Sequence, residues 1–327
     1  MDKKFKALVV DKEGVGEESI KMLRDVAEVK IAPDFSNETL EEEAKDVDAI
    51  VLAGRGFITE KLLEKAPYLK VVGRIGVGLS NIDVETATKR GVAVVYSGEA
   101  NSDTVADHVF GLMLAVARKI PQADHIIKIG FQPAGREFMG TDVWNKTLGI
   151  IGFGRIGYRV AKRARGFDMK ILVYDPYIGE DKIKEVGGKR VDLYTLLKES
   201  DFVTIHTPIT RETRELISGD KIKMMKDGAY LINAATGGII DEQALYQVLV
   251  DGKLGGAALD TPETKIGEIT IDLKKPLYKL SNVVVTPMIA AMTRECSRRT
   301  PQTTVEEVIK VLKKEKPSYI ANPSVLK

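Results

Sequence analysis

The feature that most restricts the fold of this chain is a glycine pattern placed where an apolar run ends. In the segment LGIIGFGRIG the glycines are Gly152, Gly154 and Gly157, which follow a strand-like run and precede a helical one. Gly152 permits a tight turn, Gly154 lets a ligand approach the backbone, and Gly157 lets helix and strand pack closely. The start of the helix adds free amide donors and a positive dipole, so the segment predicts a site for a phosphate group.

A second apolar run, KILVYDP, gives this pattern its context because it ends at Asp175, about 20 residues after the glycines. A carboxylate at the end of the second strand accepts hydrogen bonds from ribose hydroxyls and repels a 2′-phosphate. Together the two features predict a Rossmann domain that binds NAD rather than NADP. Arg155 and Ile156 lie between the glycines, and we expect them to line the pyrophosphate. For Arg155 the alternative is a solvated surface position.

Strand-like and helix-like segments alternate in both halves of the chain, which predicts parallel α/β sheets. The expected strands are FKALVV, VKIA, AIVLAG, VVGRIG and AVVYS, then TLGIIGFG, KILVYDP, FVTIHTP, AYLINAA, GAALD and VVVTP. A chain of 327 residues is longer than the ~250 to 300 at which a single core stops growing, so two domains are expected. The apolar helix expected over 104–118 should be buried between domains or at a subunit interface. A last helix, near 293–314, has room to return to the first domain.

Composition excludes several classes of function. The 49 Lys and Arg residues are offset by 47 Asp and Glu residues, so no net positive field favours nucleic acid. No segment approaches the ~18 to 20 uninterrupted apolar residues of a membrane span. The first apolar run stops at Asp11, too early for a signal sequence, and we expect a cytoplasmic protein. Cys296 is the only cysteine and lacks neighbours at metal-ligand spacing, so neither a disulfide nor a metal site is expected.

Across nearly its whole length the chain resembles the D-isomer-specific 2-hydroxyacid dehydrogenases, most closely their phosphoglycerate dehydrogenase branch. The motifs that carry the resemblance are VVGRIGVGLSNID, FMGTDVWNKTLGIIGFGRIG, VTIHTPITRETRELI, MMKDGAYLINAATGGIIDEQAL, GGAALD and NVVVTP. The resemblance implies two Rossmann-like domains with parallel, doubly wound sheets. A substrate domain would comprise 1–100 plus 293–327, with an NAD-binding domain, 101–292, inserted into it. It also implies a homodimer formed through the cofactor domain.

The resemblance assigns further residues to the cofactor. His206 would lie beside it, Thr207 and Pro208 over the dinucleotide, and Ala234 near the nicotinamide ribose. Asp260 would accept a hydrogen bond from the nicotinamide carboxamide. These positions carry the residue types that the family uses.

The resemblance also implies a small carboxylate substrate. Backbone amides near Val77 and Gly78 would hold its carboxylate, with Arg74 close by, although a structural ion pair is the alternative for Arg74. Ala53 and Phe57 stand where phosphoglycerate dehydrogenases carry an Arg and a Lys for their phosphorylated substrate, which disfavours phosphoglycerate.

The chain departs from the family at its three catalytic positions. Reduction of a 2-keto acid needs a cation for the carboxylate and carbonyl, an acid for the developing alkoxide, and a carboxylate that orients the acid. The family supplies Arg, His and Glu, whereas this sequence has Thr236, Met288 and Lys265. A threonine brings no charge and a methionine cannot transfer a proton. Glu263 or Glu268 would preserve the carboxylate if the alignment of this loop were shifted.

Three interpretations remain open. In the first, the protein is an oxidoreductase whose acid and anion-binding group have moved, with Lys265 as the leading candidate. In the second, tightly held NAD serves a reaction without net oxidation. In the third, the protein is a non-catalytic NAD-binding module. Other groups that would serve the first interpretation are Arg136, Tyr96, His108 and Arg294.

Overall fold

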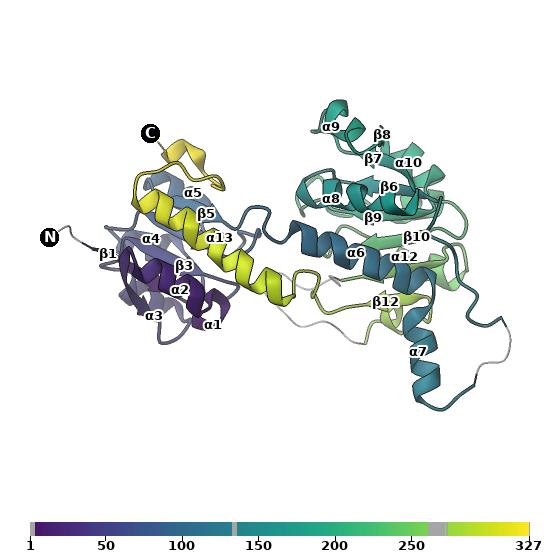
Figure 1. Ribbon diagram of the computed structural model, residues 1–327, viewed down its shortest axis with the longest axis horizontal. Helices are drawn as coiled ribbons and strands as arrows, with labels where there is room; N and C mark the ends of the chain where they lie inside the picture. Colours follow the sequence, from purple (N-terminus) through teal and green to yellow (C-terminus); the bar gives the residue numbers. More distant parts are fainter. Residues whose placement is uncertain (1–3, 133–135, 261–271, 273, 327) are drawn as a thin grey trace. The chain divides into compact units, whose positions relative to one another are not determined.

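The computed structural model describes residues 4–132, 136–260, 272 and 274–326. The chain divides into two compact units. The terminal unit comprises Met1–Asn101 and Met292–Lys327, and the central unit comprises Ser102–Ala291. Each unit is built on its own parallel sheet, and the chain enters and leaves the central unit once (Figure 1).

The terminal unit has a five-stranded parallel sheet in the order β2-β1-β3-β4-β5. Its strands are β1 (Phe5–Val9), β2 (Ala27–Ile31), β3 (Ala49–Leu52), β4 (Val71–Arg74) and β5 (Ala93–Tyr96). The central strand β3 is buried at every residue, as expected for a parallel sheet covered by helices on both faces.

Helices on both faces of this sheet complete the terminal unit. They are α1 (Lys12–Val15), α2 (Glu17–Arg24), α3 (Asn37–Glu43), α4 (Glu60–Lys65), α5 (Val84–Lys89) and α13 (Arg294–Leu312), with the 3₁₀ turn η3 (Pro323–Val325). Side chains of Thr59 and Asp83 cap α4 and α5 by accepting hydrogen bonds from backbone amides. The C-terminal helix α13 begins at the cap Thr293 and packs against β4 and β5, so the chain returns to its first sheet as predicted.

The central unit has a seven-stranded parallel sheet in the order β12-β11-β10-β9-β6-β7-β8. Its strands are β6 (Thr147–Ile151), β7 (Lys170–Tyr174), β8 (Lys189–Arg190), β9 (Phe202–Ile205), β10 (Tyr230–Asn233), β11 (Gly256–Leu259) and β12 (Val283–Val285). The chain runs outward from β6 through β7 to β8 and then crosses back to β9. The strand order therefore reverses between β6 and β9, and ligands of such sheets bind at the carboxyl ends of the strands at this point. The two parallel sheets confirm the predicted fold class.

The helices of the central unit lie along both faces of its sheet (Figure 1). They are α6 (Ser102–Ala117), α7 (Ile120–Lys128), α8 (Arg155–Ala164), α9 (Glu180–Lys184), α10 (Leu193–Glu199), α11 (Gly219–Met224) and α12 (Glu242–Val250), with the 3₁₀ turns η1 (Arg165–Phe167) and η2 (Pro276–Lys279).

The long apolar helix α6 packs within its own unit. Val109, Phe110 and Met113 are buried in one core cluster with residues of the central sheet. On the outer side, Asp103 forms ion pairs with Arg159 and another arginine of α8. Its apolar face is therefore explained by the core of the central unit, whereas the sequence alone indicated a domain or subunit interface.

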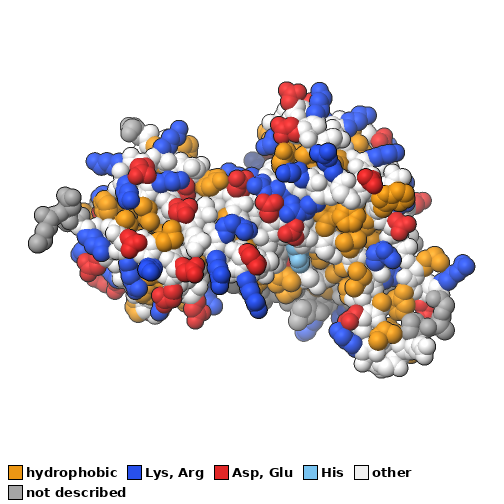
Figure 2. All heavy atoms as spheres, in the orientation of Figure 1, with side chains coloured by type: hydrophobic (Ala, Val, Ile, Leu, Met, Phe, Trp, Pro, Cys, Tyr) orange, Lys and Arg blue, Asp and Glu red, His pale blue; other side chains and the backbone are white. Residues whose placement is uncertain are grey.

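The surface carries charges of both signs. Figure 2 shows Lys and Arg side chains interspersed with Asp and Glu over the face that it draws. Among the described residues no helix has the length and hydropathy that a bilayer crossing requires. Within the same residues no cluster of His, Cys, Asp or Glu has the arrangement of a metal site. Cys296 is buried in α13.

Candidate functional site

The glycine-rich loop joins β6 to α8 at the point where the strand order reverses. Gly152 has a φ of 89°, and a Cβ atom there would lie 2.8 Å from the backbone carbon of His206. A Cβ on Gly157 would lie 2.2 Å from the carbonyl oxygen of Gly152, so the start of α8 packs directly on the loop. At Gly154, the N-cap of α8, a Cβ would meet no atom within 4 Å. The loop therefore has no room for a side chain at Gly152 and Gly157, but it has free space at Gly154.

The helix that follows presents its first turn beside this opening. Arg155 is exposed and Ile156 is half-buried against the core of the central unit. Because Gly154 makes no side-chain cap, backbone amides at the start of α8 have no partner from the N-cap residue. This is the arrangement in which a helix N-terminus holds a phosphate.

Asp175 follows the last residue of β7 and lies against the same loop. One carboxylate oxygen accepts a hydrogen bond from the backbone amide of Phe153 at 2.7 Å, and the other accepts one from Tyr177 at 2.8 Å. The carboxylate is thus fixed at the carboxyl end of β7, next to the strand that carries the glycines. This strand end is where the sequence predicts a carboxylate for a ribose hydroxyl.

Directly after β9, His206 and Thr207 contribute buried polar atoms without a protein partner. The His206 Nδ1 and the Thr207 hydroxyl are buried and make no hydrogen bond to any described residue. The other His206 ring nitrogen lies 3.0 Å from the hydroxyl of Thr204. Burial lowers the pKa of His206 to about 3, so the imidazole is neutral at physiological pH. Buried polar groups are normally satisfied, and two orphans beside the glycine-rich loop fit a site completed by a ligand. Pro208 continues this loop.

The loop after β10 carries Ala234 and Thr236. Ala234 is buried, and the backbone is held by Asn233, whose side-chain amide donates to the carbonyl of Thr236 at 2.9 Å. Asn233 also accepts from the amide of Ala235 at 3.0 Å. Thr236 is half-buried. Its backbone carbonyl, through the hydrogen bond from Asn233, helps to hold the loop.

Asp260, directly after β11, is the most heavily hydrogen-bonded carboxylate among the predicted site residues. Its side chain is 1% exposed and accepts from the Thr286 hydroxyl at 2.6 Å and from the amides of Ile289 and Ala290, both at 2.9 Å. The ring of His108 on α6 lies 3.3 Å away. Burial raises the pKa of Asp260, but these hydrogen bonds outweigh burial and the net direction is downward, so the group stays ionised. Among the described residues, Oδ2 accepts from the amide of Ala290 alone.

Met288 is hydrogen-bonded to the backbone of Asp260. Its amide donates to the Asp260 carbonyl at 2.7 Å, its φ is 57°, and its side chain is 54% exposed. A left-handed conformation is uncommon for a residue with a Cβ. The backbone of Met288 is therefore held in place while its side chain is exposed. Lys265, Glu263 and Glu268 lie outside the described residues.

In the terminal unit, Arg74 ends β4 and is half-buried. Its Nε donates to the side chain of Asn81 at 3.2 Å, and it has no carboxylate partner within the part of the chain that the structure describes. Burial lowers the pKa of the guanidinium, although not enough to neutralise an arginine. Val77 and Gly78 follow in an exposed loop. No structural ion pair of the kind considered for Arg74 is present among the described residues.

The remaining candidates are dispersed. Arg136 and Arg294 are exposed, and Tyr96 contacts the ring of Tyr319 at 6.2 Å between centroids. Thr286 was not predicted from the sequence, yet its hydroxyl lies between His108 and Asp260. Its position in the family motif NVVVTP, two residues before Met288, was a usable signal.

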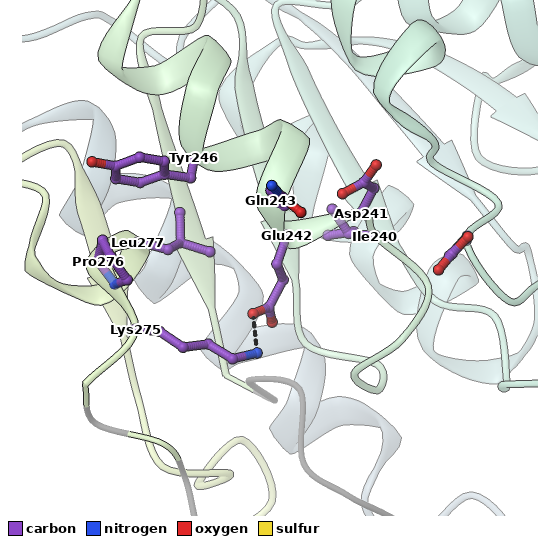
Figure 3. A pocket seen from close by; sticks show the side chains of 9 residues that line it. Ile240, Asp241, Glu242, Gln243, Tyr246, Lys275, Pro276 and Leu277 are labelled. Atoms are coloured by element: carbon purple, nitrogen blue, oxygen red, sulfur yellow. Dashed lines mark hydrogen bonds and ion pairs between the residues drawn. The ribbon is translucent and has the colours of Figure 1, made fainter.

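A cavity of about 490 Å³ lies elsewhere in the central unit, beside the start of α12. Figure 3 shows Lys275 and Glu242 reaching toward each other there, with their polar atoms 2.7 Å apart. None of its lining residues belongs to the predicted cofactor set. The cavity is therefore distinct from the glycine-rich loop.

Comparison with known proteins gives the family. The model of the D-isomer specific 2-hydroxyacid dehydrogenase NAD binding domain matches residues 110–290, more than half of the chain. The chain belongs to this family. It is 38% identical to a glyoxylate reductase of Thermococcus litoralis over 95% of this chain and 96% of the relative. It is 42% identical to a D-3-phosphoglycerate dehydrogenase of Methanocaldococcus jannaschii over 97% of this chain and 59% of the relative.

Solved structures agree with this assignment. A glyoxylate reductase from Paecilomyes thermophila superposes with a TM-score of 0.87 at 26% identity, covering 99% of this chain and 100% of the other. A D-lactate dehydrogenase from Aquifex aeolicus, complexed with NAD and lactic acid, gives 0.82 at 31% identity, covering 97% and 99%. This chain spans about three fifths of the length of the phosphoglycerate dehydrogenases that it matches. It carries the NAD-binding domain of an oxidoreductase family.

Proposed function

We propose that this protein is an NAD-dependent oxidoreductase that acts on the CH–OH group of a small 2-hydroxy acid, with Thr236, Lys265 and Met288 at the positions of the family's Arg, Glu and His. The observation that carries the proposal is the dinucleotide site at the carboxyl ends of β6, β7 and β9. There an open glycine and a fixed carboxylate adjoin two buried polar atoms that have no partner among the described residues.

Each residue of this site would bind a different group of the cofactor. Gly154 and the first amides of α8 would receive the pyrophosphate, and Asp175 would accept from the adenosine ribose. Thr207 would lie over the dinucleotide, and Asp260 would orient the nicotinamide through its carboxamide. Bound NADH supplies the hydride for reduction of a carbonyl group.

The substrate would be a small carboxylic acid. The guanidinium of Arg74 has no carboxylate partner among the described residues and is suited to a carboxylate, and the neighbouring backbone of Val77 and Gly78 offers further donors. Relatives named glyoxylate reductase and hydroxypyruvate reductase support a small 2-keto acid. Ala53 and Phe57 offer no charge for a phosphate, which disfavours phosphoglycerate.

A second candidate substrate is an imine of a 2-keto acid. A protonated imine accepts a hydride to give a neutral amine, so it needs no proton donor at the position of Met288. A structure described as an acyclic imino acid reductase in complex with NADPH and D-Arg has a TM-score of 0.83 and 28% identity, covering 96% of this chain and 99% of the other. This similarity favours including amines in the test below.

The test is oxidation of NADH, followed at 340 nm, with a panel of small 2-keto acids in the presence and absence of ammonium. A triple variant, Thr236→Arg, Lys265→Glu and Met288→His, is measured in parallel, and NADH binding is first established by fluorescence. We expect the wild type to reduce at least one acid. A protein that binds NADH tightly and reduces nothing, while the triple variant gains activity, would instead identify a silent NAD-binding protein or one that uses NAD without net oxidation.

A further inference from the structure

His108 is held by two residues that come from distant parts of the central unit. Its Nε2 lies 3.2 Å from the hydroxyl of Thr286 and 3.3 Å from Oδ1 of Asp260. The imidazole comes from the middle of α6, Asp260 from the end of β11, and Thr286 from the end of β12. Three elements therefore fix one ring.

The hydrogen bonds of this group determine which ring nitrogen carries the proton. The Thr286 hydroxyl donates its only proton to Asp260, and the ionised carboxylate of Asp260 can only accept. Both atoms near Nε2 are therefore acceptors toward the ring, and Nε2 must donate. In the neutral imidazole, Nδ1 is then the acceptor nitrogen.

This second nitrogen accepts no hydrogen bond from the described residues. The His108 side chain is 21% exposed, and its Nδ1 has no hydrogen-bond partner in the described residues of the chain. If His108 served only to join the ends of β11 and β12, its Nδ1 would not need to be free of protein partners. A carboxylate that fixes one ring nitrogen while the other has no protein partner is the arrangement used by histidines that transfer protons.

Asp260 connects His108 to Met288, which stands where the family has its catalytic histidine. The side chain of Asp260 holds His108, while the backbone carbonyl of Asp260 accepts from the amide of Met288 at 2.7 Å. His108 thus lies next to the residue that the family resemblance assigns to the nicotinamide carboxamide.

We propose that His108 is the catalytic acid and base of this protein, acting through Nδ1 in place of the family's histidine. This rests on the proposed function. Bound NADH would supply a hydride to the carbonyl carbon, and the electron pair of the C=O bond would move to the oxygen. The imidazolium gives its Nδ1 proton to that oxygen and becomes the neutral Nε2–H form, and water then restores the proton. Asp260 and Thr286 keep the ring in this form.

Two measurements test the inference. The first is a long-range ¹H–¹⁵N spectrum of the protein without cofactor at pH 8, which reports the tautomer of each histidine. The chain has only three histidines, and His125→Gln and His108→Gln assign the signals. We expect His108 in the Nε2–H form, and an Nδ1–H form would overturn the proposal independently of any activity.

The second measurement compares kcat for the best keto acid among wild type, His108→Gln and His125→Gln. The glutamine amide keeps a donor toward Asp260 and removes Nδ1, so kcat should fall ~10²- to 10⁴-fold while the Kd of NADH changes less than about threefold. Imidazole should partly restore turnover in His108→Ala. His125 is exposed on α7, and its variant should match the wild type. Wild-type turnover in a folded His108→Gln would overturn this inference alone, whereas an inactive wild type would overturn the proposed function itself.

Discussion

Gly152 and Gly154 stand two residues apart but meet different surroundings, so their substitution separates folding from binding. Alanine at Gly152 would take a left-handed conformation and contact the backbone of His206, which should lower the free energy of unfolding by about 1–3 kcal/mol. Alanine at Gly154 meets no atom and should leave the melting temperature near that of the wild type, while its methyl group weakens NADH binding. Thermal melts and fluorescence titration of both variants check this, and equal losses of stability would contradict it.

Asp175 should determine the choice of dinucleotide. Replacing it with serine removes the charge that repels a 2′-phosphate and a charged acceptor for the ribose, a hydrogen bond worth about 1.5–3 kcal/mol. We expect the Kd of NADH to rise at least ~10-fold, as that energy implies, and the Kd of NADPH to fall. Fluorescence titrations with both nucleotides measure the ratio, and an unchanged preference would exclude the assigned role.

His206 should make stability depend on pH. The pKa of its imidazole is lowered by burial to about 3 in the folded chain, against about 6.5 when unfolded. Below pH 6.5 the unfolded chain binds a proton that the folded chain refuses until pH approaches 3, so this contribution is complete above pH 6.5 and declines as the pH falls. His206→Gln should therefore lose less melting temperature between pH 7 and pH 5 than the wild type does. His125→Gln, at an exposed position, serves as the control, and parallel curves for all three proteins would refute the explanation.

At the scale of elements, a buried carboxylate on α13 holds the C-terminal segment of the terminal unit. Glu307 is 2% exposed and accepts from the backbone amides of Ser318 and Tyr319. Tyr319 in turn accepts from the amide at the end of β5, so the carboxylate anchors the C-terminal segment to the sheet. Glu307→Gln should cost about 1–3 kcal/mol, whereas the exposed neighbour Glu306→Gln should cost almost nothing. Chemical denaturation of the two variants distinguishes them, and equal midpoints would argue against the anchor.

The elements themselves were largely predictable because their signals are local. The glycine loop and Asp175 lie 22 residues apart and belong to one β-α-β unit, whose spacing fixes their geometry. The contact between His108 and Thr286 spans 178 residues and depends on how α6 lies across the sheet. No periodicity in the sequence encodes that position. For the same reason α6 was expected at an interface, when its apolar face in fact lies in the core of its own unit.

At the scale of the whole molecule, exposed apolar side chains gather on α7 and the residues that follow. Ile127, Ile129 and Phe131 are each more than half exposed, and we propose them as part of the interface of the homodimer that the family resemblance implies. Light scattering should therefore give twice the chain mass of 35.9 kDa. Ile127→Glu with Phe131→Glu should shift the protein toward monomer, and Tyr68→Glu, at an exposed site of the terminal unit, should not. A monomeric wild type would contradict this assembly.

At the scale of the whole molecule, the proposed function is hydride transfer, and isotope transfer tests that proposal most directly. The protein is incubated with a slight excess of NADH deuterated at both C4 positions and with a mixture of small 2-keto acids, and the acids are then analysed by mass spectrometry. Slow turnover suffices, since a single event per chain leaves a label. The account predicts a 2-hydroxy acid carrying one deuterium on its carbinol carbon. Tight NADH binding without deuterium in any product would contradict it.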